Sequence, residues 1–139
     1  MTFLILFVST ALVFLALDSI MLTQFMVPFF IEQIGDIMVD ELKPGAVVIF
    51  FIFYTAALLW LVSWPALRSG GYGKLMLNAA IFGAAAYGTY EFTNYATLKG
   101  WTWQMVVLDT AWGAVLTSVS AGSGVAITRA LARKLNLAL

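Results

Sequence analysis

Residues 86–101 read AYGTYEFTNYATLKGW, and this stretch places an ionisable group inside a long apolar segment. It carries Glu91 and Asn94 close to two tyrosines, Tyr87 and Tyr90. A carboxyl group at membrane depth is costly, so it usually faces the interior of a helix bundle or a water-filled cavity and marks a functional site. The stretch therefore predicts a membrane helix with a polar face that points inward.

The composition of the whole chain is that of an integral membrane protein. Of its 139 residues, 63% are hydrophobic and 10% are charged, whereas soluble domains average about 25% charged residues. The chain contains no Cys and no His, and its net charge is zero. These counts exclude disulfides, thiol nucleophiles and metals bound by thiolate or imidazole, and they give no indication of a nucleic-acid partner. We expect a single membrane domain over residues 1–139, with no cofactor.

Four apolar segments are long enough to cross a bilayer, which takes about 20 helical residues. We expect these spans over residues 3–25, 46–67, 75–98 and 104–127. The first lacks a basic leading region and is too long for the core of a signal peptide, so we expect it to be retained. Over residues 29–42, apolar residues recur at helical spacing among acidic ones, which predicts an interfacial amphipathic helix that starts after Pro28. The expected fold class is all-α: a four-transmembrane-helix bundle plus one interfacial amphipathic helix after the first span.

Short segments rich in turn-forming residues connect these spans. Residues 68–74 read RSGGYGK, a glycine-rich loop without a phosphate-binding motif. Pro65 predicts a last turn or a kink in the second span, and Lys99-Gly100 predicts a tight turn. Trp101 and Trp103 are typical of residues that anchor a helix end at the membrane interface.

The basic residues predict the orientation of the chain. An even number of spans puts the N-terminus, the 68–74 loop and the tail from residue 129 to 139 on one side, and that side carries five of the seven Lys and Arg residues. Because basic residues collect on the cytoplasmic side, we expect both termini to be cytoplasmic, in the inner membrane of a bacterium. The acidic interfacial helix would then lie at the outer face.

Polar residues from all four spans fall at one depth when they are counted from the expected span ends. At about 1.5 Å per helical residue, they lie roughly 8–12 Å below the outer surface. Helical spacing adds further residues to this layer, because positions i, i+4 and i+7 share a helix face. Gly113 and Ala114 would allow a neighbouring helix to approach closely. The residues expected to line this pocket are Asp18, Tyr54, Tyr87, Tyr90, Glu91, Asn94, Asp109 and Trp112.

No basic side chain is expected at this depth to pair with the three carboxyl groups. Desolvation and like-charge repulsion both disfavour three bare carboxylates in one site, so we expect at least one to be protonated at neutral pH. Glu91, Asp109 and Asp18 are the candidate catalytic residues, and the tyrosines, Asn94 and Trp112 are the candidate ligand-binding residues. A purely structural alternative is a hydrogen-bonded cluster that fixes helix register. Three carboxyl groups and Asn94 could hold a hard cation, but we expect no metal.

Several of these motifs together resemble a known family. Leu17-Asp18, Phe53-Tyr54, residues 87–101 and Leu108-Asp109 with Trp112-Gly113 are similar to motifs of the bacterial membrane-protein family catalogued as domain of unknown function 2177. The resemblance covers nearly the whole chain, although Glu91 stands where the family more often has Asp. It implies a small multi-span inner-membrane protein, with no established activity and therefore no catalytic residues carried over.

Three classes of function fit the sequence. The first is a protein that binds a small lipid-like or isoprenoid molecule, or acts on it by acid–base chemistry, in a carboxylate- and tyrosine-lined pocket. The second is a proton- or cation-coupled exporter of small molecules, which would form a homodimer. The third is an accessory subunit of a larger membrane complex. We favour the first class, because the pocket is aromatic and lies off-centre toward the outer leaflet, whereas transporter sites lie near the midplane. Membrane lipids are then the expected partners.

Overall fold

The computed structural model describes residues 1–69 and 71–138, and these residues form helices and loops with no strand. Gly70, in the expected glycine-rich loop, and Leu139, at the end of the expected tail, lie outside the described residues. Three helical rods are long and apolar enough to cross a membrane, and they cover Thr2–Ile37, Pro44–Arg68 and Trp103–Lys134. The predicted all-α membrane class is therefore confirmed.

The first rod is longer than predicted. It consists of α1 (Thr2–Met21), the π-helical turn η1 (Leu22–Met26), α2 (Val27–Ile34) and the 3₁₀ turn η2 (Gly35–Ile37). The chain stays helical through Pro28, between the predicted span and the predicted interfacial helix, because the π turn widens the helix shortly before the proline and so accommodates its ring and its missing N–H. The helix predicted over residues 29–42 is thus a continuation of the first rod. It ends at Ile37, and residues 38–43 are not helical.

The second rod repeats this arrangement. It consists of α3 (Pro44–Leu58), the π-helical turn η3 (Leu59–Ser63) and α4 (Trp64–Ser69). The π turn again ends two residues before a proline, Pro65, so the predicted irregularity lies one turn earlier than the proline itself. The rod covers the predicted span over residues 46–67.

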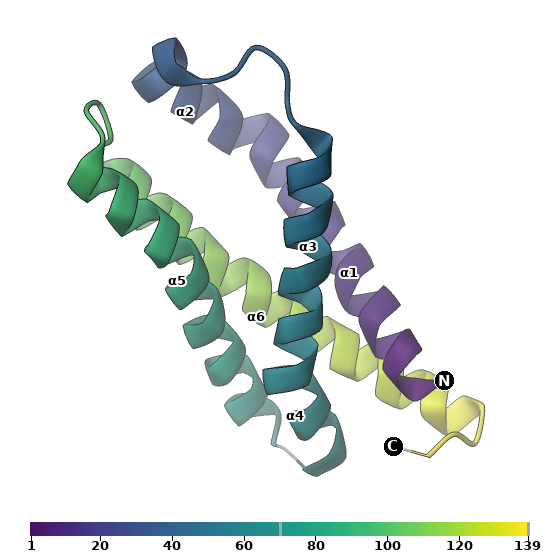
Figure 1. Cartoon of the computed structure of the whole chain (residues 1–139). Helices are drawn as coiled ribbons and strands as arrows, with labels where there is room; N and C mark the ends of the chain where they lie inside the picture. Colours follow the sequence, from purple (N-terminus) through teal and green to yellow (C-terminus); the bar gives the residue numbers. More distant parts are fainter. Residues whose placement is uncertain (70, 139) are drawn as a thin grey trace.

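Two long antiparallel helices form the other half of the molecule (Figure 1). They are α5 (Tyr72–Thr97) and α6 (Trp103–Lys134). Gly100 joins them at a φ of +84°, a left-handed conformation that glycine adopts without steric cost. The Thr102 side chain then accepts a hydrogen bond from the Met105 amide (3.4 Å) and caps α6. Helix α6 continues beyond the predicted end at residue 127, so Arg129, Arg133 and Lys134 lie on a helix rather than in an irregular tail.

Glycines bring α5 and α6 into close contact. A methyl group on Gly83 would collide with the Gly113 carbonyl oxygen and with the Thr117 side chain, and a methyl group on Gly113 would collide with the Tyr87 ring. Small residues at such positions let helix backbones approach each other in membranes. The prediction that Gly113 permits close approach is confirmed, and the contact fixes Tyr87 against α6.

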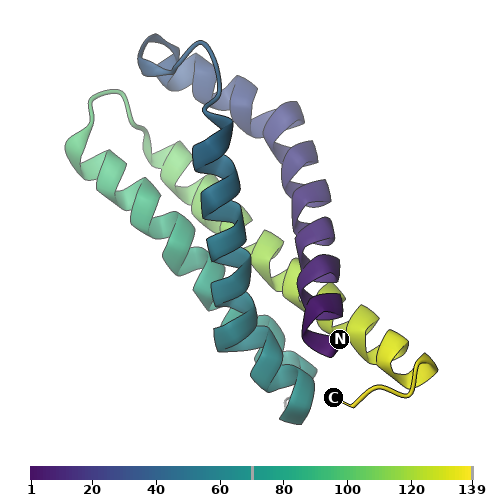
Figure 2. The ribbon, with the colours of Figure 1, turned by 45° about the vertical axis from the view of Figure 1, so that its right-hand side comes forward.

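Both termini lie at the same end of the bundle. Figures 1 and 2 show the two termini and the α4–α5 connection at one end, and the α5–α6 turn and the segment before α3 at the other. The Thr2 hydroxyl donates to the Ala138 carbonyl (2.8 Å), which ties the two ends of the chain together. The predicted polar residues belong to the other end.

Candidate functional site

Glu91 is the most deeply buried carboxyl group of the site. Its side chain on α5 is 0% exposed. Oε2 accepts a hydrogen bond from the Trp101 indole N–H (2.7 Å), across the turn that joins α5 to α6. Oε1 is enclosed and faces no N–H donor among the described residues. The carboxyl group is therefore held from one side only.

Asp109 lies beside Glu91. It lies in the second turn of α6, half-buried, and its carboxyl group is within hydrogen-bonding range of the Glu91 carboxyl. Two carboxylates only accept hydrogen bonds, so such a pair is bonded only when one of them carries a proton. The pair can therefore hold one proton between two oxygens, with Asp109 facing outward.

Asp18 brings a third carboxyl group from α1. Its Oδ1 accepts a hydrogen bond from the Trp112 indole N–H on α6 (3.1 Å), while Oδ2 has no donor among the described residues. Trp112 thus touches the site through Asp18, which it orients.

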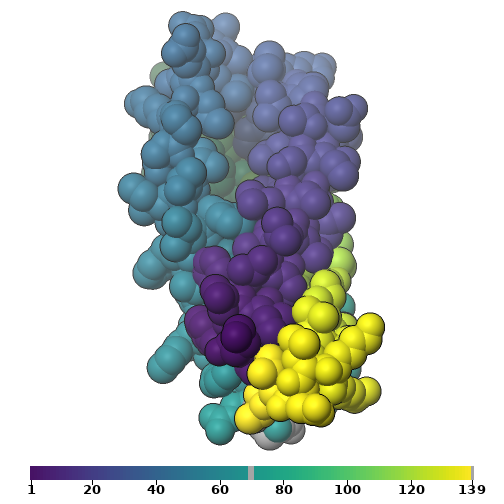
Figure 3. All heavy atoms as spheres, turned by 90° about the vertical axis from the view of Figure 1, so that its right-hand side faces the viewer, coloured from purple at the N-terminus to yellow at the C-terminus, as the bar shows by residue number. Residues whose placement is uncertain are grey.

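Asp18 and Asp109 border a cavity of about 500 Å³, a volume typical of small-molecule sites. It lies between the first rod, α3, α5 and α6. In the space-filling view, a hollow separates α3 from α1, with atoms of the α5–α6 pair at its floor (Figure 3). The described residues that line the cavity are Asp18, Leu22, Val47, Phe50, Ala86, Tyr87, Tyr90 and Asp109.

The predicted tyrosines occupy different positions around this cavity. Tyr87 and Tyr90 belong to its wall, and Tyr90, which is 54% exposed, also makes an edge contact with the Trp101 ring (5.5 Å between centroids). Tyr54 is only 4% exposed, and its hydroxyl shares a hydrogen bond with Thr117 (2.6 Å). Tyr54 therefore lies behind the cavity wall.

Asn94 lies one turn beyond Tyr90 on α5. It is half-buried, and its side chain is a hydrogen-bond partner of Tyr90 rather than of the carboxyl groups. Four of the predicted residues line the cavity: Asp18, Tyr87, Tyr90 and Asp109. Trp112 bonds the Asp18 carboxyl, and Glu91 lies against the Asp109 carboxyl. Tyr54 and Asn94 lie one contact further from the cavity.

Two residues that bond to residues of the site were not predicted from the sequence. Trp101 was predicted to be an interfacial anchor, but it is only 7% exposed and donates to Glu91, whereas Trp103 is 53% exposed as an anchor would be. Thr117 was not among the predicted site residues, yet it bonds the Tyr54 hydroxyl. The signal for Trp101 was its place directly after the Lys99-Gly100 turn, since a reversed chain returns alongside the last turns of α5.

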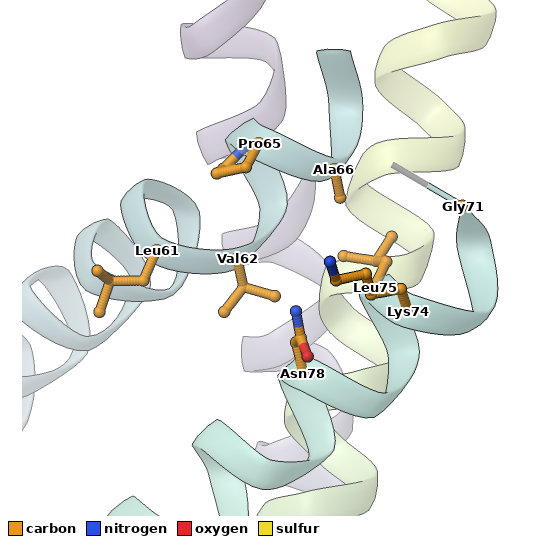
Figure 4. A pocket seen from close by; sticks show the side chains of 8 residues that line it. All are labelled: Leu61, Val62, Pro65, Ala66, Gly71, Lys74, Leu75 and Asn78. Atoms are coloured by element: carbon orange, nitrogen blue, oxygen red, sulfur yellow. The ribbon is translucent and has the colours of Figure 1, made fainter. Parts of the chain in front are cut away.

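A second pocket of about 200 Å³ lies at the opposite end of the molecule, between the second rod and the start of α5. Figure 4 shows the Lys74 ammonium and the Asn78 amide facing into it. None of the predicted site residues lines this pocket, and its charged lining residue is basic. The two pockets therefore differ in sign of charge.

No group of three or more acidic side chains among the described residues is arranged to hold a metal ion. The cavity instead offers two carboxyl groups on its wall, one buried carboxyl behind them, and aromatic and aliphatic surface. This set can bind a hydrogen-bond donor or a cation, and it can exchange one proton with a bound molecule.

Comparison with known proteins supports the resemblance seen in the motifs. No curated protein and no solved structure matches the chain. Residues 3–126 match the family model described as predicted membrane protein (DUF2177). This match includes every residue of the candidate site. The chain therefore belongs to the family of predicted membrane proteins DUF2177.

Proposed function

We propose that this membrane protein binds a small lipid-like molecule in the cavity between its four long helical segments, and that the Glu91–Asp109 pair exchanges a proton with it. The observation that carries the proposal is the position of Asp109. Its carboxyl group reaches the buried Glu91 on one side and the cavity on the other. A proton held by the pair is therefore accessible to a bound molecule.

The proposed roles follow from these contacts. Asp109 is the acid or base that meets the ligand, and Glu91 is its proton-sharing partner, held in place by Trp101. Asp18 binds the polar group of the ligand. Tyr87 and Tyr90 form an aromatic wall. Tyr54, Asn94 and Trp112 act through these residues as positioning groups.

Entry from the bilayer is favoured by the nature of the cavity rim. Leu22, Val47 and Phe50 are exposed hydrophobic residues, and each of them also lines the cavity. A lipid-like molecule could therefore keep its apolar part in contact with apolar surface while its polar group reaches the carboxyl groups.

The proposal includes an orientation in the membrane. We propose four crossings of a bacterial inner membrane, with α5 as the fourth span and both termini cytoplasmic. The five basic residues at the end that holds the termini support this orientation. Because the chain has no Cys, single cysteines can be placed at Asp40, Lys74 and Asn136. A membrane-impermeant maleimide should label only the Asp40 position in intact cells, and labelling of the Lys74 position would overturn the orientation.

The binding proposal is tested by native mass spectrometry of the protein extracted gently from its own membrane, with identification of bound lipids and small molecules. We expect one stoichiometric lipid-like ligand in the wild type and in the control Asp36→Asn, whose carboxyl group is exposed on η2. The ligand should be depleted in Asp109→Asn and in Glu91→Gln. A ligand-free wild type, or retention of the ligand by both variants, would contradict the proposal.

A proton-coupled exporter is the second candidate, and the proton-sharing pair is the observation that favours it. Phe14, Tyr54 and Leu116 pack together deeper in the bundle than the carboxyl groups and close the cavity toward the other side. Export would therefore require a second conformation in which this floor opens. In the native mass spectra, a ligand-free species with the mass of two chains would favour an exporter that works as a homodimer. Other protein subunits that co-purify with the chain would favour the accessory role in a larger complex.

A further inference from the structure

Among the described residues that line the carboxyl-lined cavity, the charged groups are acidic and none is basic. Asp18 and Asp109 are the ionisable carboxyl groups among the described lining residues, and no Lys or Arg is among them. On the elements that build the cavity, Lys43 comes four residues before Val47 at the exposed start of α3, and Lys99 lies in the exposed turn after α5. Both lie outside the lining.

Two carboxyl oxygens at this site lack the donors that a finished hydrogen-bond network would supply. Oδ1 of Asp18 is bonded to Trp112, and its Oδ2 has no donor among the described residues. Glu91 is fully buried, and its Oε1 has no N–H or hydroxyl donor among the described residues; its carboxyl group is within hydrogen-bonding range of the Asp109 carboxyl. Asp18 and Asp109 line the same cavity, so they would repel each other when both are ionised. The cavity therefore has unmet capacity for a hydrogen-bond donor that carries positive charge.

The remaining lining suits the same kind of group. Tyr87, Tyr90 and Phe50 present aromatic rings, and a cation over such a ring is attracted by its quadrupole. Leu22, Val47 and Ala86 present aliphatic surface that suits a hydrocarbon chain. Polar and apolar lining together match an amphiphile with a compact cationic head.

We propose that the ligand class of this cavity is an amine-bearing amphiphile, whose ammonium group binds between Asp18 and Asp109 while its hydrocarbon chain lies along the first rod and α3. This inference rests on the proposed function, and it adds the chemistry of the head group. A neutral amine that enters from the membrane takes the proton held by Glu91 and Asp109. An N–H bond forms as the carboxyl O–H bond breaks, and the resulting ammonium faces the resulting carboxylates.

Other head groups fit the cavity less well. A phosphate or a fatty-acid carboxylate would meet Asp18 and Asp109 as like charges, with no basic residue among the described lining to offset the repulsion. A neutral alcohol could donate one hydrogen bond, but it would leave the charge of the carboxyl groups uncompensated. Hydrogen bonds to charged groups are roughly twice as strong as neutral ones, so the amine should be preferred over the alcohol.

The test compares three probes with the same chain and different heads: dodecylamine, 1-dodecanol and dodecanoic acid. The purified protein in phosphatidylcholine nanodiscs is titrated with each probe at neutral pH, and bound ligand is read by native mass spectrometry. Wild type and the control Asp36→Asn should hold the amine about tenfold or more tightly than the alcohol and should hold the acid least. Asp18→Asn keeps an oxygen acceptor for Trp112 and should remove most of the preference for the amine.

The outcomes separate this inference from the function on which it rests. Equal binding of amine and alcohol, or tighter binding of the acid, would overturn the head-group assignment. Lipid binding in the cavity would still stand if Val47→Trp, which fills the rim, abolishes the binding of the probes. No binding of any probe to the wild type would overturn both. An unchanged amine preference in Asp18→Asn would also overturn the assignment. Where that variant does not fold, the wild-type ranking of the three probes still decides.

Discussion

Replacement of Trp101 by Phe should remove the N–H donor that holds Glu91 and leave the surrounding ring contacts largely in place. The indole donates to Oε2 at 2.7 Å, and no other N–H donor reaches this carboxyl group among the described residues. A Phe ring can still pack against Phe30 and Tyr90, which contact the indole edge-on (5.7 and 5.5 Å between centroids). The variant therefore isolates one hydrogen bond at the deepest point of the site.

The expected cost has two parts. Hydrogen bonds to charged groups contribute about 1.5–3 kcal/mol in soluble proteins, while side-chain hydrogen bonds measured in a membrane protein average about 0.6 and reach about 1.7 kcal/mol. We therefore expect about 1–2 kcal/mol for the lost bond. The smaller ring also buries less apolar surface, which costs about 1.5 kcal/mol at about 0.8 kcal/mol per buried carbon. The free energy of unfolding should fall by about 2.5–3.5 kcal/mol in total.

A double-mutant cycle separates the two parts. Unfolding is followed by SDS titration in mixed micelles for wild type, Trp101→Phe, Glu91→Leu and the double variant. In the Glu91→Leu background the packing loss remains but the hydrogen bond is absent, so Trp101→Phe should cost about 1–2 kcal/mol less there. Trp103→Phe, at an exposed ring beside the same turn, should cost less than about 0.5 kcal/mol. An equal cost of Trp101→Phe in both backgrounds would refute the idea that this bond holds Glu91.

Three further substitutions test other contacts by the same unfolding measurement. Glu91→Gln should lower the free energy of unfolding by less than about 1 kcal/mol, because the amide can accept a hydrogen bond from Trp101 and donate one to Asp109, as a protonated Glu91 would. A decrease as large as that caused by Glu91→Leu would contradict a shared proton. Gly83→Val should cost more than about 3 kcal/mol, because its side chain would collide with the backbone of α6, whereas Gly73→Ala meets open space and should stay within about 0.5 kcal/mol. Tyr54→Phe should cost about 1–2 kcal/mol through the loss of its bond to Thr117. The same variant should change ligand affinity less than about twofold, and a larger loss of affinity would place Tyr54 in the cavity wall after all.

Counting helical residues from the span ends predicted that two of the carboxyl groups lie at the same depth. Asp18 and Asp109 come from helices that are far apart in sequence, yet both were predicted at one depth, and both line the same cavity. The i, i+4 spacing likewise predicted that Tyr87 and Glu91 share a face of α5. Depth and face are properties of a single helix, so they can be read from the sequence of that helix. The roles of these residues remain predictions.

The hydrogen-bond partner of each side chain could not be predicted in this way. Whether Tyr54 bonds a carboxyl group or Thr117 depends on how α3 crosses α6, and no pattern within either helix specifies that angle. The bond from Trp101 to Glu91 depends on the tight turn at Gly100, whose positive φ brings the start of α6 back along α5. The continuous helix through Pro28 was missed because a π turn has no signature in the hydrophobic pattern, and proline alone predicts a break.

The energetics of the site argue that its acidic groups serve more than helix packing. A charged residue at the centre of a membrane helix costs about 2.5–3.5 kcal/mol on insertion scales, which is an upper limit for this off-centre site, and side-chain hydrogen bonds in a membrane protein return only about 0.6 kcal/mol on average. Glu91 has one such bond, to Trp101, and Asp18 has one, to Trp112. A proton shared with Asp109 removes one negative charge of the pair and leaves the other. Helix register could be fixed by the hydroxyl pair of Tyr54 and Thr117 without any buried charge. The ligand that we propose, which is itself a donor and positively charged, would offset this cost of the carboxyl groups.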